Sequence, residues 1–247
     1  MTALELDPLF EHIPAPGEPL AHFGMPGEPL AQLVAPGRIT ELCGSAQTTA
    51  AVSILAQAQR EGETAAWIQP VRGELYPPDL EAFGVDVGAL VVIHVPEAPA
   101  ANQRPRRAIG LGSQPTTGGQ IAGPSGQCRA AELLLRSGGF GLVVIDFCHD
   151  EPRGSTAWQG RLLGLARQHE ARLVLLRRSA REQPASLGPL VGLRLASHVA
   201  RAPAPNDPPG FTPRTGRFEL RHEVLKNKSG GPVAPAPAHV RGPWGLL

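Results

Sequence analysis

Residues 38–68 read RITELCGSAQTTAAVSILAQAQREGETAAWI, and this stretch decides the fold class. It opens with an alternating run at 38–43, typical of a β-strand, and passes through Gly44 into a helical stretch at 48–60. A glycine soon after ends the helix, and residues 64–69 predict a second strand. A strand, a glycine turn, a helix and another strand form the repeating unit of an α/β sheet.

The same alternation continues along the chain. Further helices are expected at 79–83, 127–137 and 156–169, and buried strands at 89–95, 141–147 and 171–176. Two runs with a period of two residues, 192–201 and 216–226, are separated by a Pro-rich loop and predict an antiparallel pair. The sequence therefore predicts an α/β fold, with a mostly parallel sheet, helices on both faces and an antiparallel extension.

Glycine and proline set the expected domain boundaries. The chain has 247 residues with 29 Gly and 27 Pro, and these two residue types gather in three segments. We expect a Pro-rich, acidic, extended segment at 1–36 and a folded domain at 37–228 that contains a disordered insert at 96–126. A flexible tail is expected at 229–247.

Charge and cysteine content exclude several classes of function. The net charge is +1, which predicts weak DNA contact at most, and the three cysteines have no metal-binding spacing. We therefore expect no metal and no disulfide framework. No apolar run is long enough to span a membrane and no leader is recognisable, so a cytoplasmic protein without membrane contact is expected.

Lysine usage is the most restrictive feature of the composition. Of the 23 basic residues only Lys226 and Lys228 are lysines, and the other 21 are arginines. A P-loop needs a Gly-rich turn, a lysine that reaches the phosphates and a hydroxyl group for magnesium. The turn after the first strand has one glycine, Gly44, followed by Thr48 and Thr49, and no lysine. The cradle for phosphate is absent, although a helix amino terminus attracts anions weakly.

Residues 38–68, the strand GLVVIDF at 141–147 and the segment EVLKNKSGGP at 223–232 resemble the nucleotide-binding core of the RecA recombinases. The resemblance implies a RecA-like fold with a degenerate P-loop. It also implies a vestigial nucleotide site at Gly44, Thr48, Thr49 and Asp146. From the residues alone, Asp146 either holds a metal through water or caps the following loop. Where that family has the acid that orients the attacking water, this sequence reads QPVR at 69–72, and Glu74 comes several residues late.

Lys226, Asn227 and Lys228 match the KNK of the recombinase pattern. In that family this segment reaches across the subunit interface toward the nucleotide of the neighbour. The resemblance therefore implies a RecA-type partner interface at these three residues. The alternative is that two solvent-facing lysines protect the end of a strand against pairing.

The missing P-loop, together with the segment ASLGPLVGLR at 185–194, resembles the ImuA family, the RecA-related accessory of bacterial inducible mutagenesis. This resemblance implies a non-catalytic, cofactor-free adaptor in SOS-induced translesion synthesis. Its implied partners are RecA, whose filament it would cap or inhibit, and ImuB with an error-prone polymerase α subunit. It also implies association with the nucleoid during DNA damage.

Two aromatic residues, Phe10 and Trp244, lie in Pro-rich terminal segments and are weaker candidates for partner binding. Two other functions stay open. One is an atypical nucleotide hydrolase that uses Asp146. The other is a DNA-binding recombination mediator that uses two groups of arginines, namely Arg104, Arg106 and Arg107 and then Arg177, Arg178 and Arg181.

Overall fold

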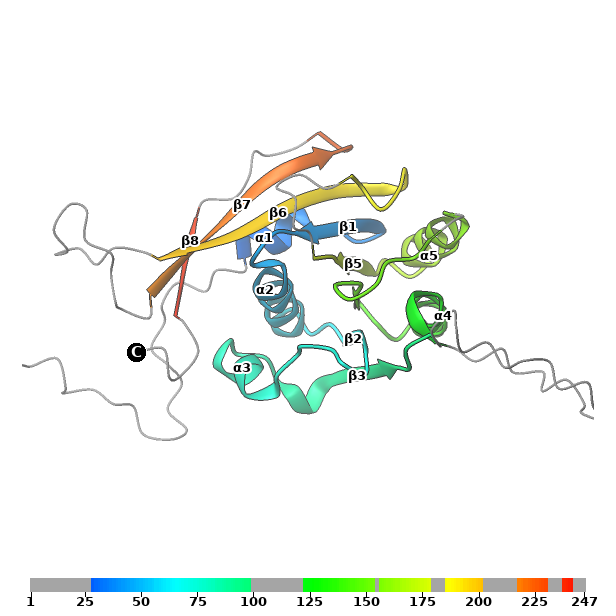
Figure 1. Cartoon of the computed structure of the whole chain (residues 1–247), viewed down its shortest axis with the longest axis horizontal. Coiled ribbons are helices and arrows are strands. Elements are labelled where there is room, and N and C mark those ends of the chain that lie inside the picture. Colours follow the sequence, from blue (N-terminus) through cyan, green and yellow to red (C-terminus); the bar gives the residue numbers. More distant parts are fainter. Residues whose placement is uncertain are drawn as a thin grey trace, which may run out of the picture.

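Eight strands form one sheet in the computed structural model, which describes residues 28–98, 122–153, 156–178, 185–201, 217–230 and 237–241. The strands are β1 Arg38–Cys43, β2 Ala65–Pro70, β3 Leu90–Val95, β4 Leu142–Asp146, β5 Arg172–Leu176, β6 Val191–Arg201, β7 Arg217–Asn227 and β8 Ala238–Arg241. The helices are α1 Glu28–Leu33, α2 Gln47–Arg60, α3 Pro77–Ala82, α4 Gly123–Ser137 and α5 Ala157–Gln168, with a 3-10 turn, η2, at Val87–Ala89 (Figure 1).

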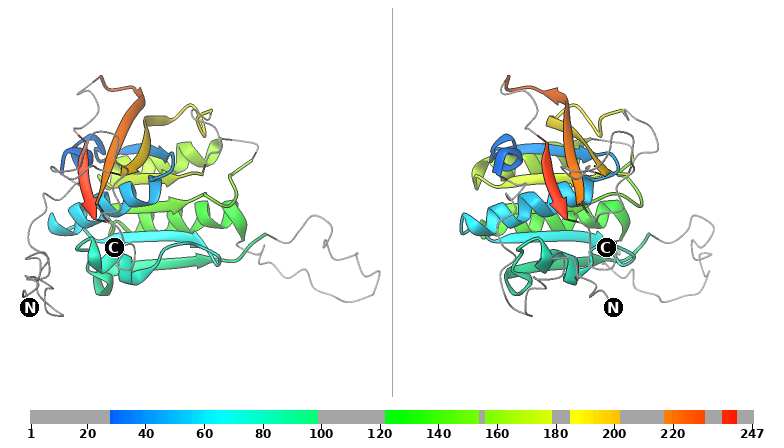
Figure 2. Two further views of the ribbon diagram at one scale, coloured as in Figure 1. Left: turned by 60° about the vertical axis from the view of Figure 1, so that its left-hand side comes forward. Right: turned by 90° about the vertical axis from the view of Figure 1, so that its left-hand side faces the viewer.

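The strand order is β3-β2-β4-β5-β1-β6-β7-β8. The first six strands in this order are mutually parallel, whereas β7 is antiparallel to β6 and β8 is antiparallel to β7. Strands β7 and β8, orange and red in Figure 2, run at a steep angle to the parallel strands. The predicted α/β class, with a parallel sheet and an antiparallel extension, is confirmed.

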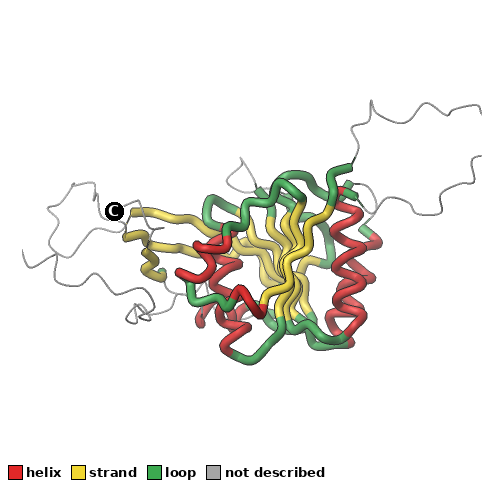
Figure 3. The backbone as a smooth tube through the Cα atoms, turned by 90° about the horizontal axis from the view of Figure 1, so that it is seen from below, coloured by secondary structure: helices red, strands yellow, loops and turns green. Residues whose placement is uncertain are grey.

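Helices cover both faces of the parallel strands, as predicted (Figure 3). On one face α1 and α2 pack in a core that includes Leu30, Leu55 and Trp67. On the other face α4 and α5 pack in a second core that includes Leu135 and Leu162. Because the central strands are covered on both sides they are apolar almost throughout, and all five residues of β4 are buried.

The prediction that 89–95 is a buried strand was wrong about burial. Strand β3 forms at Leu90–Val95 but lies at the edge of the sheet, where Val91 and Val92 are 40% and 37% exposed. A run of β-branched residues favours a strand in either position, so composition alone does not distinguish an edge from a centre.

The prediction that residues 1–36 are extended was also wrong for the residues of this segment that the structure describes. Residues Glu28–Leu33 form α1, with Pro29 in the first turn, where a missing N–H group costs no hydrogen bond. Leu30 is fully buried, and the carbonyl of Val34 accepts a hydrogen bond from Arg172 Nε at 3.1 Å. Residues 1–27 lie outside the described residues.

Two further boundaries differ from the prediction. Helix α4 begins at Gly123, with a proline in its first turn, so residues 123–126 belong to the helix and not to a disordered insert. Residues Ala238–Arg241 of the expected tail form β8, which pairs with β7 and extends the sheet. The rest of the predicted insert from 99 to 121 lies outside the described residues.

Replacing Leu30 by alanine tests whether α1 is part of the folded domain. We expect a loss of about 2–4 kcal/mol in the free energy of unfolding, because a fully buried leucine would leave a cavity between α1 and α2. Urea unfolding measures this loss, and Gln32→Ala, an exposed position on the same helix, is the control. Equal stability of the two variants would contradict the packing of α1.

Candidate functional site

The connection between β1 and α2, the expected position of a phosphate cradle, is only Gly44, Ser45 and Ala46 long. Gly44 has φ = 98°, and a Cβ atom there would lie 2.3 Å from the carbonyl oxygen of Ser197 in β6. The N–H of Ala46 donates to the same oxygen at 2.9 Å. The turn is therefore fastened to the neighbouring strand, and its Ala46 N–H does not face a ligand.

The first turn of α2 has the positive dipole end of a helix but lacks the lysine and the Gly-rich turn that bind a nucleotide. Ala46 makes no side-chain cap, and there is no acidic residue in the first turn. Gln47 is buried, and its Nε2 donates to Cys148 Sγ at 3.6 Å. Thr48 and Thr49 are half-buried. The helix amino terminus that the sequence predicts is present, and it is joined to the end of β4 by Gln47.

Asp146 ends β4 and is 5% exposed. Its Oδ1 accepts a hydrogen bond from the backbone N–H of Cys148 at 2.8 Å, so the carboxylate caps the loop that follows the strand. Burial, reinforced by the negative charge of Asp146, raises the pKa of the Cys148 thiol. Of the two roles that the sequence leaves open for Asp146, the structure contains the loop cap.

A surface ion pair lies near this end of the sheet. Both carboxylate oxygens of Glu74, which follows β2, lie 2.6 Å from Arg178 Nη2, which follows β5. His149 Nε2, after β4, lies 4.0 Å from Glu74 Oε1. Glu74 is therefore bound to a guanidinium group. The loops after β2, β4 and β5 meet here, at the edge where an α/β sheet binds ligands.

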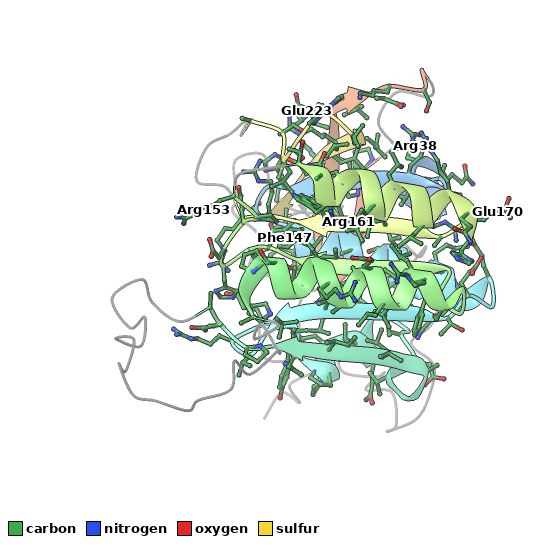
Figure 4. All side chains as sticks on the ribbon, turned by 90° about the vertical axis from the view of Figure 1, so that its right-hand side faces the viewer. Arg38, Phe147, Arg153, Arg161, Glu170 and Glu223 are labelled. Carbon is green, nitrogen blue, oxygen red and sulfur yellow. The ribbon has the colours of Figure 1, made fainter. Side chains whose placement is uncertain are left out.

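Lys226, Asn227 and Lys228 lie at the opposite end of the parallel strands. Strand β7 ends there, and Asn227 Oδ1 accepts a hydrogen bond from Arg38 Nη2, at the start of β1, at 3.1 Å. In Figure 4, Arg38 and Phe147 mark the two ends. By register, Lys226 lies beside Arg194 and Arg194 beside Glu41, so Lys226 is two strands across from β1 and three residues along it from Gly44.

The two lysines have different surroundings. Lys228 is exposed, its N–H donates to Gly192 O at 2.9 Å, and its Nζ bonds to the carbonyl of Pro189. Lys226 is half-buried opposite Arg194 in β6. Partial burial and the neighbouring charges of Lys228 and Arg194 lower the pKa of Lys226. The segment therefore presents clustered positive charge at one edge of the sheet.

Glu41, in β1, binds several distant residues, and we did not predict a role for it from the sequence. It is fully buried in β1, 3.1 Å from Arg194 Nε and 3.4 Å from Arg177 Nη1. Its Oε2 accepts from Leu187 N–H at 2.9 Å. An acid inside the apolar alternation of 38–43 was the only signal in the sequence, and its partners lie more than 130 residues away.

Arg177 is therefore not a surface cation, which corrects its assignment to a DNA-binding group. It is 9% exposed and also pairs with Glu151 at 2.6 Å. Arg178 is paired with Glu74. Five other predicted residues lie outside the described residues, and the structure says nothing of them: Phe10, Arg104, Arg106, Arg107 and Trp244. The same is true of Arg181.

A buried serine and histidine lie beside the Gly44 turn. Ser197 Oγ is 2.9 Å from His222 Nδ1, and the two residues face each other across β6 and β7. The His222 ring is 7% exposed, its Nε2 has no hydrogen-bond partner, and burial lowers its pKa to about 4. This pair was also missed from the sequence, because it depends on the register of two distant strands.

Within the described ranges no three metal-binding side chains come together, and no helix is long and apolar enough to cross a membrane. The described residues thus contain a helix amino terminus without a cradle at one end of the sheet and a basic segment at the other.

Comparisons with known proteins point to one superfamily. Over 113 residues, 44% of the chain, the sequence is 35% identical to Protein RecA of Clostridium acetobutylicum and of Clostridioides difficile. It is 34% identical to Protein RecA of Francisella tularensis subsp. novicida over the same length. These matches cover about a quarter of the length of the relatives, 24–25%. No family model matches the chain.

The fold gives the second observation. The structure is similar to the crystal structure of the RadB recombinase, with a TM-score of 0.50 over 89% of this chain and 96% of that chain. The identity is 17%, so this likeness concerns the fold alone. The chain has a RecA-like fold and is similar in sequence to Protein RecA over 44% of its length. Its predicted relationship to the RecA-like superfamily is confirmed at this level.

The buried His222 predicts a dependence of stability on pH. Its pKa is about 4 in the folded chain against an ordinary value of 6.5, so the unfolded chain binds more protons between these values. The stability is full above pH 6.5 and falls as the pH decreases toward 4, by about 2–3 kcal/mol for this group. Urea unfolding at pH 7.5 and 4.5 measures the loss.

The variant His222→Leu should lose this part of the pH dependence, whereas His149→Gln, at an exposed histidine, should keep it. An equal change in unfolding free energy with pH in wild type and His222→Leu would contradict a neutral, buried His222. Comparing slopes separates this effect from any uniform loss of stability that the substitution causes.

Proposed function

We propose that this protein is a non-catalytic RecA-like adaptor, which binds RecA and caps or inhibits its filament. The observation that carries the proposal is the turn at Gly44–Ala46. A nucleotide triphosphate needs several backbone N–H groups and a lysine around its phosphates. Here a three-residue turn is fastened to Ser197, and the chain has no lysine before Lys226.

The second support is the position of the basic segment. Lys226 ends β7 with Asn227 and Lys228 follows it, two strands across the sheet from β1 and its Gly44 turn, and this separation supports contact with a phosphate of another molecule. An ammonium group is a compact charge suited to phosphate contact. Burial, and after it the charges of Lys228 and Arg194, lower the pKa of Lys226, and an anion from a partner would offset the repulsion among these charges.

RecA is the partner proposed because this chain is similar in sequence to Protein RecA and shares the recombinase fold. Such a molecule would present a recombinase-like surface to the last RecA subunit of a filament. It would have no bound ATP to offer to a further subunit, so the filament would not grow past it. This asymmetry supports capping over incorporation along the filament.

The finer proposal places the adaptor in SOS-induced translesion synthesis as a member of the ImuA family, with ImuB and an error-prone polymerase α subunit as further partners. Its support is the ImuA-like segment at 185–194, of which Ser186 and Leu187 are bound to Glu41. Co-purification of RecA and of ImuB with the tagged full chain, after DNA damage, tests each partner separately. Recovery of neither partner would contradict the adaptor.

Nucleotide titration distinguishes the adaptor from an atypical hydrolase. We expect no saturable binding of magnesium ATP up to the millimolar range, because Asp146 is used to cap its loop and the turn offers no phosphate cradle. Isothermal titration calorimetry measures this directly. A micromolar affinity, lost in Asp146→Asn, would contradict the proposal and favour the hydrolase.

Replacing both Lys226 and Lys228 by glutamine tests the interface with RecA. We expect purified wild-type protein to lower the DNA-dependent ATPase rate and strand exchange of RecA, and the double variant to lose most of this effect. Removing two charge contacts to phosphate costs about 1 kcal/mol or more each, which corresponds to at least a fivefold weaker effect per lysine.

Arg221→Gln, an exposed charge on the same strand, is the matched control and should inhibit RecA as wild type does. An unchanged RecA ATPase rate with wild-type protein, or equal inhibition by the double lysine variant, would contradict this interface. Steeply salt-dependent retention of DNA by the wild-type protein would instead favour a DNA-binding mediator.

A further inference from the structure

A groove of about 320 Å³ lies between α4 and α5, on the face of the sheet opposite α2. Its floor contains Cys128 and Leu162, which are buried, and Trp158, which is 8% exposed. Pro152 lies at one end of the groove, in the loop after β4. The volume falls within the range of sites that bind a few side chains, and the floor is apolar.

Arginine side chains line the walls of this groove. Arg129 extends from α4, Arg161 from α5 and Arg153 from the loop between β4 and α5. Their side chains are 46%, 58% and 90% exposed, so the guanidinium groups have kept much of their access to solvent. Figure 4 shows Arg161 between the two helices and Arg153 near the same end of the sheet as Phe147.

The positive charge of the groove is only partly compensated. Glu132, 9% exposed, is the acid of the groove, and it is shared by Arg129 at 3.0 Å, Arg136 at 2.6 Å and Arg161 at 3.8 Å. Of the arginines that line the groove, Arg129 and Arg161 therefore share one carboxylate, which Arg136 also binds from outside the lining. Arg153 has a second acid, Asp150, at 3.4 Å. The groove has an excess of donors and positive charge around an apolar floor.

We propose that this groove binds an acidic, apolar peptide segment, and that its occupant is residues 4–13 of this chain. The segment reads LELDPLFEHI. It carries three acids, Glu5, Asp7 and Glu11, between leucines and Phe10, and residues 1–36 contain no lysine or arginine. An acidic segment with large apolar side chains complements a groove that has arginine walls and a Trp158–Leu162 floor.

The chain is long enough for this contact. Residues 14–27 connect the segment to Glu28 at the start of α1, and a connection of this length spans up to about 45 Å when extended. A small domain is about 30 Å across, so a linker of this length can reach from α1 to the α4–α5 face. The same segment of a second copy would meet the same groove.

Photocrosslinking in the full chain tests this proposal. Phe10 is replaced by p-benzoylphenylalanine, the protein is irradiated, and the crosslinked peptides are identified by mass spectrometry. We expect crosslinks within 123–137 or 156–168, the peptides of α4 and α5. Mixing isotope-labelled and unlabelled protein shows whether the crosslink joins one molecule or two, and either result supports the groove as the site.

Two sets of variants test the charge complementarity. We expect Arg153→Glu with Arg161→Gln to lower the crosslink yield by up to about fivefold for each ion pair lost, and Glu5, Asp7 and Glu11→Gln to lower it similarly. The second set changes no residue of the described core. A lower yield from it is therefore not explained by damage to the packing of α4 and α5. Arg60→Gln, an exposed arginine at the end of α2, is the control and should leave the yield unchanged.

Crosslinks that map elsewhere, for example to β3, would overturn the proposal. So would a yield that is insensitive to both sets of charge variants, because an apolar contact alone would not need these arginines. The absence of any crosslink, with a normal urea unfolding transition, would overturn it as well.

Discussion

A buried carboxylate in the first strand organises the sheet around it. Glu41 is fully buried and is bound to Arg177 after β5, to Arg194 in β6 and to the backbone of Leu187 before β6. An uncompensated charge at this depth would cost several kcal/mol, so the partners have to be in place for the sheet to form. The order of β5, β1 and β6 and the path of the segment that enters β6 follow from this constraint.

The same part of the molecule decides what the Gly44 turn can do. Because β6 is held against β1, Ser197 lies close to Gly44 and takes the N–H of Ala46. In a P-loop the backbone N–H groups of the turn surround phosphate, whereas here the N–H of Ala46 is bonded to a neighbouring strand. A turn that is held to β6 in this way does not present the N–H of Ala46 to a phosphate.

Most of the fold was predictable from the sequence because it depends on local patterns. The periodicity of 38–68, the apolar run before Asp146 and the alternation in 192–201 each predict their element within a few residues. The two Pro-rich boundaries were not predictable in the same way. Leu30 and Leu33 stabilise α1 only because the second layer of the core is there to receive them.

Residue identity alone showed that no lysine lies beside Gly44. The candidate site was not predictable where function depends on strand register. The Ser197–His222 pair and the separation of Lys226 from Asp146 follow from how β6 and β7 lie beside β1. Glu132 with its three arginines follows from the contact of α4 with α5, which no spacing within either helix reveals.

Strand β3 gives the molecule one open side. In the described part of the chain, no strand pairs with its outer edge, and Leu90–Val95 contains neither lysine nor proline, the usual guards against pairing. Its backbone offers a row of hydrogen-bonding groups to any extended segment that approaches, and Val91 and Val92 add apolar surface. An extended segment that paired with β3 would therefore add a strand to the sheet at this edge.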